Sequence, residues 1–172
     1  NGRYAPVLSL MFIAWGISSW ALALAIGSQV STRAGKTGLV FLILAGIGEA
    51  MASVFDVNHS LHGLAAMIGI PSLPVAAMLI SISLSRTQEW SAAKKALLWT
   101  ANLTWVSLLL LAGAFAMLIV TYTQTGGDMN AGAVSVLPPG VIAWVGWANR
   151  LLIVVYCVWV LTVARQAIKL RR

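Results

Sequence analysis

Apolar residues run along this chain in five long stretches, each broken by only a few polar positions. The stretches are continuously apolar rather than alternating, so they predict helices and not the strands of a transmembrane barrel. A helix that crosses a bilayer needs about 20 mostly apolar residues. All of the stretches meet that test, and they cover about residues 5–30, 37–55, 61–84, 96–122 and 139–164.

These stretches take up most of the chain, and no soluble domain or long linker separates them. We therefore predict an all-α fold, a polytopic transmembrane helical bundle with five spans that forms a single membrane-embedded domain over residues 1–172. The composition agrees, because 60% of the residues are hydrophobic and only 9% are charged.

The net charge of +7 follows from basic residues that gather in three places. If each span crosses once, these places share one side of the membrane, and the opposite loops, residues 56–60 and 123–137, contain no Lys or Arg. This pattern predicts a multi-pass protein with a cytoplasmic C-terminus and an extracytoplasmic 56–62 loop. The positive charge then orients the protein in the membrane and contacts anionic lipid head groups, and we expect no nucleic-acid partner. The residues are Arg33, Lys36, Arg86, Lys94, Lys95, Arg165, Lys169, Arg171 and Arg172.

The start of the chain does not fit that topology by itself. Counting five spans back from a cytoplasmic C-terminus places Asn1 outside, with Arg3 as the one basic residue on that side. The chain also begins with Asn rather than Met. We expect a sixth span before Asn1 and two cytoplasmic ends in the full-length protein, with a removed signal peptide as the alternative.

Polar residues crowd the point where the second and third stretches meet. Glu49, Asp56, His59 and His62 include two of the four acidic residues and both histidines of the chain. Ionisable groups at membrane depth cost several kcal/mol unless they are paired or hydrated, so they are functional candidates. At 1.5 Å per residue, Glu49 should lie roughly 18 Å into its span, a little past the midplane.

The last stretch holds a basic residue at a similar depth. Arg150 should lie roughly 16 Å below the outer surface if the helix begins at Pro139. We predict a Glu49–Arg150 ion pair in the bundle interior, with Asn149 nearby. The pair either locks two helices together or leaves Arg150 to hold an anionic head group or carboxylate.

Asp56, His59 and His62 form an outer polar cluster with three interpretations. The first is a capping turn, in which Asp56 or Asn58 caps the third helix. The second is a metal site, because two histidines and one aspartate leave an open position suited to a catalytic zinc. The third is a cluster that titrates protons or contacts lipid at the outer leaflet.

Proline and tryptophan residues mark further positions inside the spans. Pro71 and Pro74 fall within the third stretch, where they kink a helix and free a carbonyl for a partner or water. Trp15, Trp20 and Trp105 lie deep in their spans, where they either pack in the core or flank a hydrophobic ligand.

The phrase FDVNHSLHGLAAMIGIPSLP, followed by GWANRL, resembles the bacterial membrane proteins grouped as domain of unknown function 998. These proteins are similar in turn to the eukaryotic Frag/DRAM/Sfk-type membrane proteins. The resemblance covers nearly the whole chain and implies a six-span bundle in the bacterial inner (plasma) membrane. The resemblance implies no established reaction. Relatives suggest a role in lipid handling, but that suggestion is an analogy between folds and not evidence from a site. The family's pattern falls on Asp56, His62, Gly146, Asn149 and Arg150.

Three functional hypotheses follow. The first is a non-enzymatic integral membrane protein that binds lipid or another hydrophobic ligand, or acts as an accessory subunit of a membrane complex. The second is an intramembrane hydrolase or lipid-remodelling enzyme that uses Asp56, His59 and His62, with zinc activating water. The third is a proton-coupled transporter in which Glu49 takes up and releases a proton and Arg150 recognises an anion. The expected partners are the bilayer, other membrane subunits or a hydrophobic ligand.

Overall fold

The structure is a computed structural model that describes residues 5–55, 59–128 and 136–170. Within these ranges the chain forms helices and no strand, which confirms the predicted all-α class. Five of the helices are long and apolar enough to cross a membrane. They are α1 (Ala5–Ile26), α2 (Arg33–Val54), α3 (His62–Leu84), α4 (Lys94–Gln124) and α5 (Val145–Leu170), with the short 3₁₀ helices η1 (Gly27–Gln29) and η2 (Gln88–Ala93) between them.

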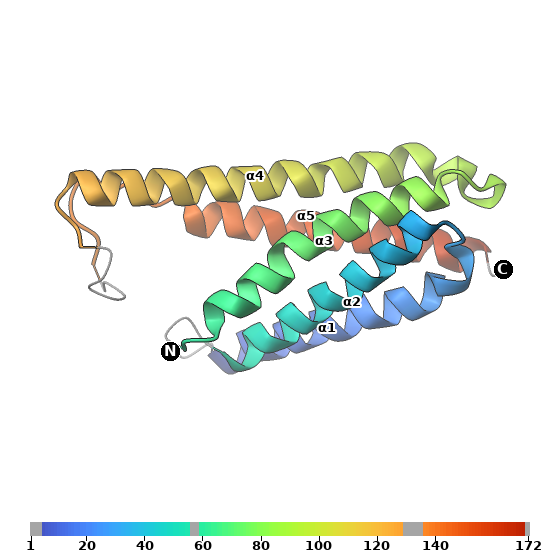
Figure 1. The fold of residues 1–172 in the computed structure, drawn as a ribbon, viewed down its shortest axis with the longest axis horizontal. Coiled ribbons are helices and arrows are strands. Elements are labelled where there is room, and N and C mark those ends of the chain that lie inside the picture. The colour runs from blue at the N-terminus through green and yellow to red at the C-terminus, as the bar shows by residue number, and fades with distance from the viewer. Residues whose placement is uncertain (1–4, 56–58, 129–135, 171–172) are drawn as a thin grey trace.

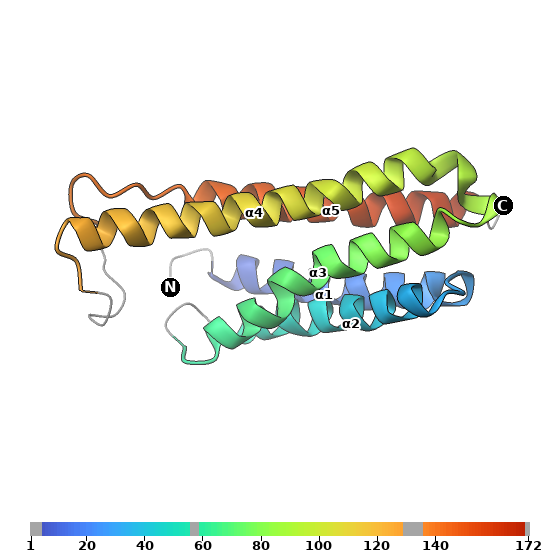
Figure 2. The ribbon, with the colours of Figure 1, turned by 45° about the horizontal axis from the view of Figure 1, so that its top comes forward.

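The long helices lie roughly along one axis and form two layers joined by α3. Figure 2 shows α4 and α5 on one side, α1 and α2 on the other, and α3 crossing between the two layers. The most extensive contacts join α2 to α3 and α1 to α2, followed by α4 with α5 and α3 with α4. At one end α4 extends well past the start of α5 (Figure 1). α3 is therefore the element on which both layers pack.

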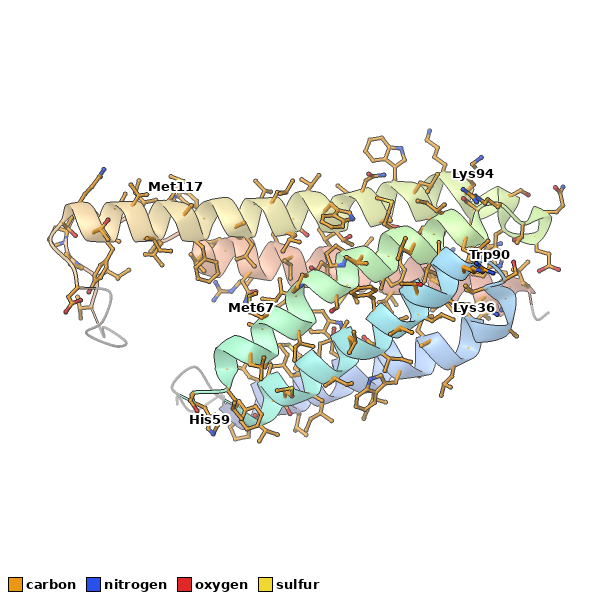
Figure 3. The ribbon with its side chains drawn as sticks, in the orientation of Figure 1. Lys36, His59, Met67, Trp90, Lys94 and Met117 are labelled. Atoms are coloured by element: carbon orange, nitrogen blue, oxygen red, sulfur yellow. The ribbon has the colours of Figure 1, made fainter. Side chains whose placement is uncertain are left out.

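Many large apolar side chains are exposed on the surface of the bundle. Leu42, Leu73 and Trp159 are fully buried where helices meet, whereas Leu24 is 84% exposed and Met67 is 74% exposed. Figure 3 shows apolar side chains along the outward faces of the helices. Soluble monomers rarely expose contiguous apolar surface on this scale. The exposed surface therefore suits hydrocarbon, in agreement with the length and hydropathy of the helices.

Glycines let α2 approach its neighbours closely. A Cβ on Gly48 of α2 would overlap the backbone of Gly69 on α3, and a Cβ on Gly16 of α1 would come within 2.8 Å of the carbonyl oxygen of Gly46. Helices in membranes gain stability from van der Waals packing of this kind, since hydrophobic burial offers little there. These contacts set the distances between α1, α2 and α3.

The basic residues gather at one end of the bundle, as the loop pattern predicts. Lys36, Trp90 and Lys94 lie at the end with η1, η2 and the last turn of α5, and His59 lies at the opposite end (Figure 3). Among the described residues only Arg150 departs from this grouping, because it lies near the start of α5. The Trp90 indole donates to Gln29 Oε1 at 3.0 Å. This bond links the α1–α2 connection, which contains η1, to the α3–α4 connection, which contains η2.

The observed boundaries differ most from prediction at α5. This helix begins at Val145 rather than near Pro139 and continues to Leu170. Gly140 has a φ of +91°, outside the helical region, and the Val141 N–H donates to the carbonyl of Pro138 at 3.3 Å in a turn. The prediction was wrong here because the residues of this turn are as apolar as a span.

Helix α2 begins earlier than predicted, at Arg33. The side chain of Thr32 accepts a hydrogen bond of 3.0 Å from the N–H of Gly35 and caps the first turn. An N-cap of this type satisfies one of the backbone donors that every helix start leaves unpaired. The cap therefore extends the helix to include basic residues that lie outside the apolar stretch.

Candidate functional site

A cavity of about 130 Å³ lies between α1, α2, α3 and α5. It is near the end of the bundle opposite the basic residues, since His62 begins α3 and Asn149 lies close to the start of α5. A cavity needs only about 10–15 Å³ of such volume to hold one water molecule, so this space is large enough for a small ligand group. Its lining consists of Phe12, Trp15, Gly48, Glu49, Ala52, His62, Ala65, Ala66, Gly69, Ile70, Asn149, Leu152, Ile153 and Tyr156.

Each helix contributes one face to this lining. The residues on each helix recur at intervals of three and four, which places their side chains on a common side. α1 supplies two aromatic rings, α2 supplies Glu49, α3 supplies His62 and small residues, and α5 supplies Asn149 and Tyr156. The cavity is thus mostly apolar, with a few polar groups that converge on it.

Glu49 is the most unusual of these polar groups. Its side chain is only 6% exposed, and its Oε2 accepts a hydrogen bond of 2.9 Å from the hydroxyl of Ser19, which is fully buried on α1. Within the described residues, no ion pair and no second hydrogen bond reaches this carboxyl. Buried acidic groups are normally paired or bonded several times. Glu49 therefore has bonding capacity left on the side that faces the cavity.

Aromatic rings form one wall beside Glu49. The rings of Phe12 and Trp15 stack with their centroids 6.2 Å apart, and Trp15 meets the ring of Tyr156 edge-on at 6.1 Å. The Trp15 Nε1 is buried and has no hydrogen-bond partner among the residues described. Trp15 therefore both packs against the core and lines the cavity. Trp20 instead donates its Nε1 to the carbonyl of Ile43 at 3.1 Å.

Tyr156 also closes the break that proline makes in α3. Its hydroxyl donates to the carbonyl oxygen of Ile70 at 2.7 Å. Ile70 is four residues before Pro74, which has no N–H to offer that carbonyl. The prediction that a proline frees a carbonyl for a partner is confirmed, and the partner is a side chain of α5.

The two histidines lie in different surroundings. His62 is half-buried and lines the cavity, and its Nδ1 lies 2.9 Å from the carbonyl oxygen of Phe55. A carbonyl can only accept, so this Nδ1 bears the hydrogen, and Nε2 of the neutral ring is an acceptor. His59 is exposed, stacks on the Phe55 ring at 4.5 Å and accepts the N–H of Leu61 at Nδ1. Its neutral ring therefore has the opposite tautomer.

The predicted cluster of Asp56, His59 and His62 is described only in part. Asp56 and Asn58 lie outside the described residues. In the ranges that are described, no three His, Cys, Asp or Glu side chains lie close enough together to hold a metal ion. Of the two histidines, only His62 reaches the cavity that Glu49 lines. The zinc and capping interpretations remain predictions as far as Asp56 is concerned.

The predicted Glu49–Arg150 ion pair is wrong. Arg150 is exposed, its Nη1 donates to the carbonyl of Gly146 at 3.1 Å, and its guanidinium lies 5.4 Å from the centre of the Trp147 ring. Because α5 begins at Val145, Arg150 is roughly 8 Å along the helix instead of the 16 Å that was expected. Asn149, predicted to lie beside the pair, is the residue of this turn that reaches the cavity.

Several lining or supporting residues were missed in the sequence, and Phe12, Ser19 and Tyr156 are those that make the contacts described above. Phe12, Trp15 and Ser19 are spaced by three and four residues, so they share one face of α1. The rest of α1 is also apolar, so this spacing alone does not single out that face. Nothing comparable marks Tyr156, because it contacts the site through packing between distant segments.

Comparisons of this chain with protein-family models, with curated proteins and with solved structures find no match. The resemblance to domain of unknown function 998 thus stays a prediction. The function has to be argued from the cavity itself.

Proposed function

We propose that this protein is a non-enzymatic integral membrane protein that binds a lipid or another hydrophobic molecule in the cavity between α1, α2, α3 and α5. The cavity is the observation that supports it: a space of about 130 Å³ with a mostly apolar lining and a few converging polar groups. Ligand sites in proteins usually have this character. A space of this size accepts one end of a lipid and leaves the rest along the apolar surface of the bundle.

The orientation of the bundle belongs to the same proposal. We place the protein in the bacterial inner membrane with the basic end and the C-terminus in the cytoplasm, following the positive-inside rule. The grouping of Arg33, Lys36, Lys94 and Lys169 at one end supports this orientation. The cavity then lies in the outer half of the membrane.

Binding is favoured over hydrolysis by the placement of the hydroxyl groups. Ser19 is the hydroxyl that donates to a carboxyl, but it is fully buried and is not part of the cavity lining. Tyr156 lines the cavity, but its hydroxyl already donates to the carbonyl of Ile70. A nucleophile has to reach both its base and the substrate. The described hydroxyls do not combine these two properties.

Filling the cavity tests the proposal. Ala66 on α3 is half-buried and lines the cavity, so Ala66→Leu adds volume inside it. Ala112→Leu on the exposed face of α4 is the matched control. Both variants and the original protein are purified in lipid nanodiscs and analysed by native mass spectrometry after stepwise removal of lipid. We expect one tightly held lipid on the original protein and on Ala112→Leu, and its loss from Ala66→Leu. Equal retention of lipid by all three proteins would refute the proposal, as would the absence of both retained lipid and any other bound ligand from the original protein.

A further inference from the structure

Within the part of the chain that the structure describes, Glu49 has no positively charged partner. Among the described residues, Arg150 is exposed and bonded to its own helix, and the other basic side chains belong to the opposite end of the bundle. The carboxyl nevertheless lies at a position that is only 6% exposed, with Ser19 as its one hydrogen-bond donor. A buried carboxylate gains most from a donor that is itself charged. The cavity beside it is the space where such a donor fits.

The wall next to Glu49 is suited to the same kind of group. The rings of Phe12, Trp15 and Tyr156 adjoin one another along one side of the cavity. Ring faces attract cations, and aromatic side chains recur where proteins recognise alkylated ammonium groups. The volume of about 130 Å³ is close to that of a small head group and far below that of a complete lipid.

Asn149 adds a neutral polar group to this arrangement. Its side chain lines the cavity from α5, and within the described ranges its amide makes no hydrogen bond. The amide oxygen can accept from an N–H of a ligand, and the amide N–H groups can donate to a neighbouring oxygen. Asn149 thus offers a second anchor for a ligand whose cation pairs with Glu49.

We propose that the cavity recognises an ammonium group, with the carboxylate of Glu49 as its counter-ion and the rings of Phe12, Trp15 and Tyr156 around its carbon substituents. The inference rests on the proposed binding function and specifies the ligand class. An amine-bearing lipid head group and a free alkylammonium compound share this chemistry. A bare divalent cation fits less well, because it takes about six to eight oxygen ligands and this lining is mostly apolar.

A comparison of a cation with its neutral isostere tests the charge directly. Choline and 3,3-dimethylbutan-1-ol have nearly the same shape, and their binding to the purified protein is measured by isothermal titration calorimetry. We expect choline to bind at least tenfold more tightly than the alcohol. Glu49→Gln should abolish that preference, whereas Glu89→Gln, an exposed position in η2 at the other end, should keep it. Equal binding of the two compounds, or full choline binding by Glu49→Gln, overturns the proposal.

A second variant keeps the test valid if Glu49→Gln does not fold. Phe12→Leu removes one ring of the wall and leaves the carboxyl and Ser19 in place. We expect choline binding to weaken several-fold while binding of the neutral alcohol is unchanged. An equal loss for both compounds contradicts a role of the ring in recognising charge.

Nanodiscs distinguish the two sources of the ammonium group. Equimolar phosphatidylethanolamine, phosphatidylcholine and phosphatidylglycerol are offered, and the lipid retained is identified by native mass spectrometry. Preferential retention of the two lipids with an ammonium head group, phosphatidylethanolamine and phosphatidylcholine, lost in Glu49→Gln, assigns the site to a head group. Choline binding without such retention assigns it to a free ammonium compound. Retention of lipid in the cavity with no preference for amines and no choline binding overturns this inference but leaves the proposed function standing. If no ligand of either kind binds, both proposals fail.

Discussion

The Tyr156 hydroxyl on α5 donates a hydrogen bond of 2.7 Å to the backbone carbonyl of Ile70 on α3. The bond joins the two layers of the bundle at the point where Pro74 interrupts the backbone ladder. Proline leaves this carbonyl without its N–H partner within the helix, and inside a bundle of helices another group has to pair with it. The carbonyl that Pro74 leaves unpaired in α3 is therefore hydrogen-bonded by a side chain of α5, which is distant in the chain.

Removal of this hydroxyl should destabilise the protein. Tyr156→Phe leaves the Ile70 carbonyl unpaired, which should lower the free energy of unfolding by about 1–3 kcal/mol. In a Pro74→Ala background the restored N–H can pair with the carbonyl, so the same substitution should cost less. Titration with a denaturing detergent, followed by tryptophan fluorescence, measures both values. Equal costs in the two backgrounds would show that the carbonyl is not the group that Tyr156 serves.

The hydroxyl of Ser19 should contribute far more to stability than the hydroxyl of Ser18. Ser19→Ala removes the hydrogen bond to Glu49 and should lower the free energy of unfolding by about 1–3 kcal/mol. Ser18 is exposed and bonds only the carbonyl of Ala14 in its own helix at 2.7 Å. Ser18→Ala should therefore change stability by less than about 0.5 kcal/mol. The same detergent titration compares them, and similar effects would argue against the buried bond.

The close approach of α2 and α3 should tolerate no side chain at Gly48. In Gly48→Ala the added Cβ would overlap the backbone of Gly69, so the helices must separate, at a cost of about 1–3 kcal/mol. Gly113 on α4 has nothing within 4 Å of the same position. Gly113→Ala should thus cause no loss of stability. The prediction fails if Gly48→Ala unfolds at the same detergent concentration as Gly113→Ala.

Arg150 should be dispensable for stability. A broken buried ion pair costs about 3–5 kcal/mol, but Arg150 is exposed and bonded to Gly146. Arg150→Gln should then change the free energy of unfolding by less than about 0.5 kcal/mol. A double-mutant cycle with Glu49→Gln should give a coupling energy near zero. A coupling above about 1 kcal/mol would mean that the two side chains interact after all.

The helices of this protein were predictable, because the apolar stretches are long and each marks one element. The start of α5 was not, since Val141, Ile142 and Ala143 look like part of a span. They lie instead in a segment that follows the turn at Pro138 and Gly140. That error displaced Arg150 by roughly 8 Å along the helix axis and produced the incorrect ion pair.

The site was predictable as far as its polar residues stand out against an apolar background. Glu49, His62 and Asn149 were all identified, and all of them line the cavity. Ser19 was not identified, because α1 is apolar on every side and its sequence does not reveal which face turns toward α2. The pairing depends on the approach of Gly16 to Gly46, which only the packed structure shows.

The extra length of α4 has a consequence for the surface of the membrane. With 31 residues at 1.5 Å each, α4 is about 47 Å long, whereas the hydrocarbon core of a bilayer is about 30 Å thick. A helix with this mismatch either tilts or emerges into water. The last turn of α4 is polar, and Thr121 Oγ1 accepts the N–H of Ile142 at 3.0 Å. If α4 crosses the bilayer without tilting, its polar last turn lies outside the hydrocarbon, and the chain leading into α5 is hydrogen-bonded to it there.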